Sequence, residues 1–139
     1  MELKEVIEKR HSIRVYQKQD VPDEILMEVI ALARRCPSAG AIRGFQAIIS
    51  RQKLYNRIDA PVYLVICTNP ELYARRYGDR GRNLYAIQDA TIFGAYIQLI
   101  LVDKGLASCW IGAFNEGQIQ KAVDTTLQPV AIIAVGYAC

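Results

Sequence analysis

The chain has 139 residues, 52% of them hydrophobic, and its 17 Lys and Arg against 14 Asp and Glu leave a formal net charge of +3. This size and composition predict one compact domain over residues 1–139 with a core of its own, and they exclude a disordered tail. The mild basic excess suits a small anionic ligand and falls short of the charge typical of a nucleic-acid-binding surface.

The first predicted element is a helix over residues 2–9, because Leu3, Val6 and Ile7 recur at helical spacing. It leads into residues 10–14 (RHSIR), which we call the N-terminal cluster. Guanidinium groups and a serine hydroxyl match the oxygens of a phosphate. The alternative is a solvated turn with a capping serine, and the cluster alone does not decide between the two.

A second helix is predicted to open at Pro22, with acidic residues in its first turn, and to stop before Pro37. A turn of small residues follows at 37–40 (PSAG), which would let another surface come close. Residues 45–50 form a predicted strand, and the apolar run 60–68 is typical of a central strand buried on both faces.

Residues 69–83 (NPELYARRYGDRGRN) are predicted to form a mobile surface segment, because two glycines interrupt a polar, basic stretch. One interpretation is a solvated basic loop, and the other is an anion-contacting flap over a site. The arginines concerned are Arg75, Arg76, Arg80 and Arg82.

The longest predicted helix covers residues 84–104 and ends at Gly105. Its second half is apolar nearly all round, so it must lie in a core, a subunit interface or a membrane. The apolar run is too short to cross a bilayer, and a chain of this size cannot easily surround the helix alone. We therefore expect a homodimer, with Gly94 and Ala95 allowing close approach of a partner helix.

The remaining elements are a short strand within 106–114 that runs into a tight turn, a short helix over 115–123 and a last buried strand at 129–136. Four strands interspersed with helices favour an α/β or α+β layered domain.

Little in the sequence offers chemistry of its own. The four cysteines show no metal-ligand or disulfide spacing and no leader pattern is present, which indicates a reducing, cytoplasmic setting. With a single histidine and no Cys/His cluster, the chain offers few ligands for a transition metal, so we do not expect a metal enzyme. No common nucleophile or nucleotide-loop motif is present. A phosphate-binding cluster without catalytic side chains is typical of an enzyme whose chemistry is carried by a phosphate-bearing cofactor.

Blocks in the same order make the chain resemble the FMN-dependent nitroreductase family over nearly its whole length. They are the N-terminal cluster, the Pro37–Gly40 turn, the long helix that ends before Gly105-Leu106, the segment 110–114 (WIGAF) and the closing strand 129–137. One departure is Ala41, where many members have Asn, and the Ala form looks closer to the thiazoline-oxidase-like branch. The other is the end at Cys139, where typical members continue into an extension that adds a basic phosphate contact.

The resemblance implies an α+β, three-layer α/β/α fold with a mixed, mainly antiparallel sheet and a long buried central helix. It also implies a homodimer with two FMN sites at its interface. On the phosphate and ribityl side, the resemblance implies contacts from Arg10, Ser12 and Arg14, with the backbone of His11. From the other subunit, it implies contacts from the turn of Pro37, Ser38, Ala39 and Gly40. At the ring, it implies packing by Trp110 and Ile111, and hydrogen bonds to flavin N5 and O4 from the backbone N–H groups of Gly112 and Ala113.

We therefore predict an FMN-dependent oxidoreductase that passes hydride from NAD(P)H to a flat, electron-poor small molecule such as a nitroaromatic or quinone, without nucleic-acid or membrane partners. The alternatives are a flavin-handling protein with little turnover and a small basic binding module. Trp110 is alternatively a core aromatic, and Cys36 is expected to be a buried packing residue. We also expect the arginines between Arg75 and Arg82 to replace part of the positive charge that the missing extension would bring to the phosphate.

Overall fold

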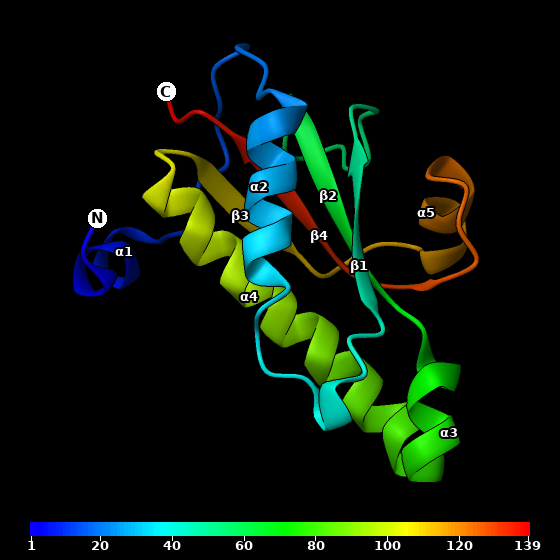
Figure 1. Cartoon of the computed structure of the whole chain (residues 1–139). Helices are drawn as coiled ribbons and strands as arrows, with labels where there is room; N and C mark the ends of the chain where they lie inside the picture. The colour runs from blue at the N-terminus through cyan, green and yellow to red at the C-terminus, as the bar shows by residue number, and fades with distance from the viewer.

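The computed structural model describes all residues, 1–139. The chain folds into five α-helices and one four-stranded sheet, and Figure 1 shows how they are arranged. The helices are α1 (Leu3–Lys9), α2 (Asp23–Ala33), α3 (Pro70–Arg80), α4 (Ala86–Asp103) and α5 (Glu116–Ala122), and the strands are β1 (Phe45–Ser50), β2 (Val62–Thr68), β3 (Ala107–Ile111) and β4 (Gln128–Gly136).

The sheet has the strand order β1-β2-β4-β3, and every neighbouring pair runs antiparallel. Parallel pairing enters only as an isolated bridge between Ser12 and Ser108. β2 is an inner strand and all of its residues are buried, as its unbroken apolar run predicted. The α+β class with a mainly antiparallel sheet is therefore confirmed.

The sheet separates two hydrophobic clusters, which makes the molecule layered. Alternate residues of β2 point to opposite faces: Leu64 packs under α2 and α4, whereas Tyr63 packs on the other side with Ile119 of α5. The long helix α4 lies across the first face, beside α2 (Figure 1). The central helix and the strands thus form the core that positions the N-terminal cluster and the turns of the candidate site.

Helix ends follow their local signals. The side chain of Asn115 caps α5 by accepting a hydrogen bond from the amide of Gln118, at 2.9 Å. Gly105 follows α4 with φ = 77°, the left-handed conformation that glycine adopts after a helix. Both boundaries agree with the sequence-based expectation.

The segment 69–83 is not the predicted mobile loop, because most of it is helical. Pro70 occupies the first turn of α3, where its missing N–H costs nothing. The backbone kinks at Gly78 (φ = 62°, ψ = −143°) and passes through a π-helical turn, η2 (Gly81–Tyr85), into α4. The glycines that suggested a loop therefore mark a kink in a continuous helical run.

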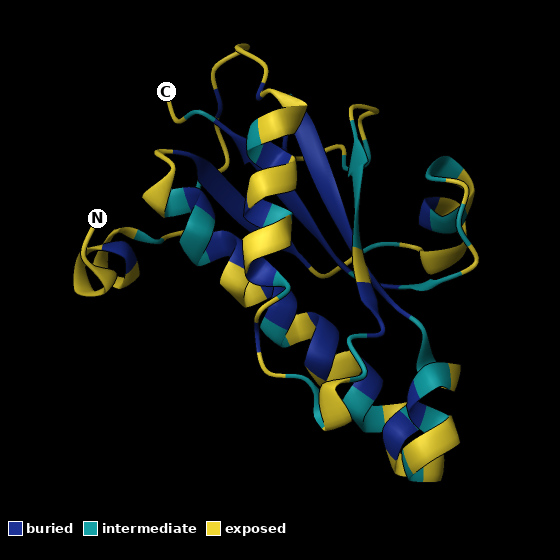
Figure 2. Cartoon of the chain, viewed as in Figure 1, coloured by how far each residue is buried: buried dark blue, intermediate teal, exposed yellow.

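By length and composition alone, the run Pro70–Asp103 could cross a membrane, but the core helix of a soluble protein passes the same test. In this fold one side of α4 faces the sheet and is buried, and Figure 2 shows exposed yellow patches on its other side. Large apolar residues on that outer side include Ile87 and Tyr96, which are 37% and 39% exposed. α4 is thus a core helix with one uncovered apolar face.

Gly94 does not lie on the uncovered face, contrary to the expectation that it meets a partner helix. A Cβ atom added there would lie 2.6 Å from Cζ3 of Trp110, so Gly94 makes room for the indole of its own chain. Ala95, by contrast, is exposed. The close approach at Gly94 joins α4 to β3 within one chain.

Gly94→Ala should lower the free energy of unfolding by about 2 kcal/mol, because the methyl group overlaps the indole and this outweighs the better helix propensity of alanine. Urea unfolding at fixed protein concentration measures the loss. Adding Trp110→Phe should restore part of it, since the smaller ring leaves space. A Gly94→Ala variant that changes only self-association would contradict the intrachain packing.

Candidate functional site

The N-terminal cluster is fastened to the edge strand β3. Ser12 bridges to Ser108, and the amide of Ile13 donates to the carbonyl oxygen of Ser108 at 3.0 Å. The buried Gln98 of α4 donates from Nε2 to the Ser108 hydroxyl at 3.2 Å. Because the strand and the core helix both hold this point, the cluster has a fixed path although its side chains face outward.

The polar side chains of the cluster are free to meet a ligand. Ser12 and Arg14 are exposed, Arg10 is half-buried, and neither arginine forms an ion pair. The ring of His11 instead bonds to the carbonyl oxygen of Lys9, with 2.9 Å between Nδ1 and O. Two unpaired guanidinium groups and a hydroxyl therefore lie on one short stretch, which is the donor set a phosphate needs.

The turn after β3 supplies a second group of donors. The register between β3 and β4 ends at Ile111, so Gly112 and Ala113 follow the last paired residue and are exposed. Ser108 and Gly112 are four residues apart on an extended chain, or about 13 Å. An elongated ligand along β3 could thus meet the N-terminal cluster at one end and these amides at the other.

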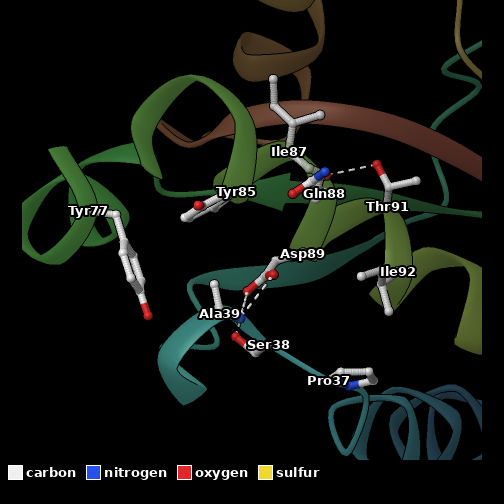
Figure 3. Close-up of a pocket in the computed structure, with 10 residues that line it drawn as sticks. All are labelled: Pro37, Ser38, Ala39, Tyr77, Tyr85, Ile87, Gln88, Asp89, Thr91 and Ile92. Atoms are coloured by element: carbon white, nitrogen blue, oxygen red, sulfur yellow. Dashed lines mark hydrogen bonds between the residues drawn. The ribbon is translucent and has the colours of Figure 1, made fainter. Parts of the chain in front are cut away.

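The turn at Pro37–Gly40 is held by a buried carboxylate. Asp89 of α4 is 3% exposed and accepts hydrogen bonds from the Ser38 hydroxyl (2.5 Å), the Ala39 amide (3.2 Å) and the Tyr73 hydroxyl (2.8 Å). The Ser38 oxygen also accepts from the amide of Arg43 at 2.8 Å. This network, which we call the Asp89 network, fixes the turn against α4 (Figure 3).

Two arginines beside the turn are structural. Arg43 donates to the carbonyl oxygens of Arg34 (2.6 Å) and Cys36 (2.5 Å), and Arg34 donates to the carbonyl oxygen of Phe45 at 2.8 Å. Both thereby satisfy backbone groups between the end of α2 and β1. Ala41 has φ = 55°, a left-handed conformation in which Asn is more common than alanine.

Burial determines the protonation of two groups near the turn. Desolvation, followed by the hydrogen bond to Asp89, raises the pKa of Tyr73, which therefore remains a neutral donor. Desolvation also raises the pKa of Cys36, whose side chain is fully buried in the core. Cys36 is thus a protonated packing residue, as expected.

A pocket of about 700 Å³ opens between the turn and the start of α4 (Figure 3). Its lining consists of Pro37, Ser38, Ala39, Tyr77, Tyr85, Ile87, Gln88, Asp89, Thr91 and Ile92. This volume is in the range of small-molecule sites. The pocket contains neither the N-terminal cluster nor Gly112 and Ala113, so a single chain does not bring the predicted contacts together.

The two groups of predicted residues lie beside different parts of α4. The N-terminal cluster is held at Ser108, whose hydroxyl accepts a hydrogen bond from Gln98 in the second half of this helix, whereas the turn is bonded to Asp89 near its start. Asp89 and Gln98 are nine residues apart on α4, or about 14 Å. Arg75, Arg76 and Arg80 belong to α3, which lies beyond the start of α4 (Figure 1), so within one chain they lie away from the N-terminal cluster.

Trp110 is half-buried, and it packs on the core cluster and on Gly94. The core-aromatic interpretation therefore holds for the part of its ring that touches α4, and the packing of Trp110 and Ile111 on a flavin stays a prediction.

Sequence reasoning missed Asp89 and the tyrosines Tyr73, Tyr77 and Tyr85. Asp89 did leave a signal, since a carboxylate at the start of an apolar helix must find buried partners. The tyrosines left none, because their role depends on where α3 packs.

Comparisons with known proteins agree with this arrangement. The family model described as "Putative TM nitroreductase" matches residues 2–139. A protein of Methanothermobacter thermautotrophicus described as "Putative NADH dehydrogenase/NAD(P)H nitroreductase" is 26% identical, with 99% of this chain and 78% of that protein covered.

Solved structures are similar over the whole fold. A nitroreductase family protein from Clostridium difficile 630 is 29% identical, with a TM-score of 0.86 and coverage of 99% of this chain and 85% of that one. An FMN-dependent nitroreductase from Clostridium difficile R20291 is 27% identical, with a TM-score of 0.78 and coverage of 96% and 86%. Since the family model covers nearly every residue and the fold agrees, the chain belongs to the nitroreductase family of oxidoreductases.

Proposed function

We propose that the protein binds FMN and transfers hydride from NAD(P)H to a flat, electron-poor small molecule such as a quinone or nitroaromatic. This proposal rests on two exposed groups of hydrogen-bond donors: the N-terminal cluster beside the start of β3, and the amides of Gly112 and Ala113 after its end. A relative at 27% identity is described as FMN-dependent, which supports the same cofactor here. In the overall reaction NAD(P)H loses a hydride, and a quinone gains that hydride and a proton to become a hydroquinone.

The donor set fits FMN. Arg10, Ser12 and Arg14 would bind the phosphate through charge-assisted hydrogen bonds, with the backbone of His11 beside them. The amides of Gly112 and Ala113 would donate to the polar edge of the ring and orient it. When bound, FMN supplies the two-electron chemistry that no side chain of this protein provides.

The site would be completed by a second copy of the chain. The Pro37–Gly40 turn is bonded near the start of α4 and the N-terminal cluster is held beside its second half, so we infer that the turn that approaches the ring belongs to a partner. The outer face of α4 beyond the pocket, where Ala95 and Tyr96 are exposed, is available for that contact. We therefore propose a homodimer with two equivalent sites at its interface.

The test is to incubate the purified protein with FMN, remove free flavin by desalting, and count bound FMN per chain from the visible spectrum. We expect about one FMN per chain, a dimer by light scattering, and rapid NAD(P)H oxidation when a quinone is added. A yellow protein that oxidises NAD(P)H no faster than free FMN would instead indicate flavin handling. A colourless protein would overturn the proposal.

A further inference from the structure

An arginine and tyrosine cluster borders the pocket at the end of α3. The rings of Tyr77 and Tyr85 meet edge to face, with centroids 5.1 Å apart and an interplanar angle of 79°. The guanidinium carbon of Arg76 lies 5.3 Å from the Tyr77 centroid, and that of Arg80 lies 5.7 Å from the Tyr85 centroid. We call these four residues the aromatic corner.

The cations of the aromatic corner have no carboxylate partner. Arg82, on the same helical run, is paired with Glu71 and Asp79, at 2.8 and 2.7 Å. Arg76 donates only to the carbonyl oxygen of Gly40 (3.2 Å) and Arg80 only to the Tyr85 hydroxyl (3.2 Å). The positive charge of each arginine is thus not neutralised by a carboxylate, and each guanidinium keeps free N–H donors beside the pocket-lining tyrosines.

The corner and the Pro37–Gly40 turn are built against each other. Gly40 has φ = 56°, and a Cβ atom placed on it would lie 2.8 Å from the Tyr77 hydroxyl and would also collide with the Arg76 guanidinium. A side chain at residue 40 would therefore displace the ends of Arg76 and Tyr77 and would also be strained by the positive φ. Because Tyr77 and Tyr85 line the same pocket as Pro37 to Ala39, a molecule in the pocket touches the corner and the turn together.

We propose that the aromatic corner recognises the electron acceptor, and that this acceptor is a flat aromatic molecule carrying an anionic group. This inference rests on the proposed function, in which the turn borders the flavin ring. The tyrosines offer ring faces and edges for stacking, with Ile87 and Ile92 as apolar walls, and the arginines would bind a carboxylate or sulfonate at the rim.

The rest of the pocket is compatible with an anion. Asp89 is its only charged lining residue, and that carboxylate is 3% exposed with both oxygens accepting hydrogen bonds from the chain. Its charge is therefore screened at the floor of the pocket by its three donors. The positive charge nearest the pocket is that of Arg76 and Arg80, beside the lining residues Tyr77 and Tyr85.

The first measurement is a binding experiment that does not depend on turnover. Calorimetry on the FMN-incubated protein compares naphthalene-2-sulfonate with naphthalene-2-sulfonamide, which has the same ring and nearly the same shape but no charge at neutral pH. We expect the double variant Arg76→Ala/Arg80→Ala to weaken binding of the sulfonate about tenfold and to leave the sulfonamide nearly unchanged. An equal loss for both probes would overturn the proposal.

The matched control is Arg75→Ala. The side chain of Arg75 is exposed on α3 and makes no ion pair, hydrogen bond or cation–π contact, whereas those of Arg76 and Arg80 bond to Gly40 or Tyr85 and lie over the tyrosine rings, so removal of Arg75 changes net charge alone. We expect it to alter sulfonate binding less than twofold. If Arg75→Ala weakened binding as much as the double variant, the effect would be general electrostatics and the corner would have no specific role.

Kinetics separate the acceptor from the dinucleotide, which also carries anionic groups. With the flavin-loaded protein, the double variant should lower kcat/KM about tenfold for 1,4-naphthoquinone-2-sulfonate, with little change for uncharged menadione. A rise in the KM for NAD(P)H instead would assign the arginines to the donor and overturn the proposal. A colourless protein that still binds the sulfonate selectively would overturn the flavin assignment and leave anion recognition by the corner intact.

Discussion

Asp89→Ala should lower the free energy of unfolding by about 4 kcal/mol, the largest stability loss we expect from any polar substitution in the chain. The substitution removes the acceptor of three hydrogen bonds, from the Ser38 hydroxyl, the Ala39 amide and the Tyr73 hydroxyl. Tyr73 is fully buried, so its hydroxyl cannot turn to solvent. Urea unfolding at neutral pH measures the loss.

Asp79→Ala is the matched control, because it also removes a carboxylate from the α3–α4 run. Asp79 is exposed and pairs only with Arg82, so this variant should lose no more than about 1 kcal/mol. Asp89→Asn should fall between the two, since one acceptor oxygen remains. Equal stability of Asp89→Ala and Asp79→Ala would show that the network contributes nothing.

Asp89→Asn should also lower the retention of FMN if the turn borders the flavin. Both Asp89 oxygens accept hydrogen bonds from the chain, so Asp89 is a positioning residue that acts through Ser38 and Ala39. We expect Asp89→Asn, which keeps the fold, to retain less FMN after desalting than Asp79→Ala does. The measured ratio of FMN to folded chain separates this role from a loss of stability.

The strands and most helix ends were predictable because their signals are local. The apolar run of β2 needs both faces covered wherever it lies in the sheet, and Asn115 and Gly105 carry cap chemistry that acts within one turn. The N-terminal cluster was identified by residue type for the same reason. Its attachment to Ser108 was beyond sequence reasoning, since the bridge joins segments almost a hundred residues apart.

The segment 69–83 shows where local interpretation fails. Glycines and arginines are typical of loops, but Pro70 after Asn69 is also a helix start, and tertiary packing favoured that alternative. Gly94 shows the same limit. A small residue on an apolar helix indicates close approach, but only the structure shows that the approaching group is Trp110 of the same chain.

Arg14→Ala should weaken FMN binding roughly 10- to 100-fold, because a charge-assisted contact to a phosphate contributes about 1.5–3 kcal/mol. Arg14 is exposed and unpaired, so removing it leaves no buried group unsatisfied and the fold should remain intact. Ser12→Ala removes a neutral donor and should cost only about fivefold. Equilibrium dialysis against FMN gives the dissociation constants.

Lys9→Ala provides the control for charge, since Lys9 is exposed at the end of α1 and contacts His11 only through its backbone carbonyl. It should retain FMN almost as the unaltered chain does. Riboflavin provides a second control, because it lacks the phosphate: its binding should be equally weak with and without Arg14. If Arg14→Ala weakened riboflavin and FMN to the same degree, Arg14 would act on the ring or the fold, and the phosphate end of the site would have to lie elsewhere.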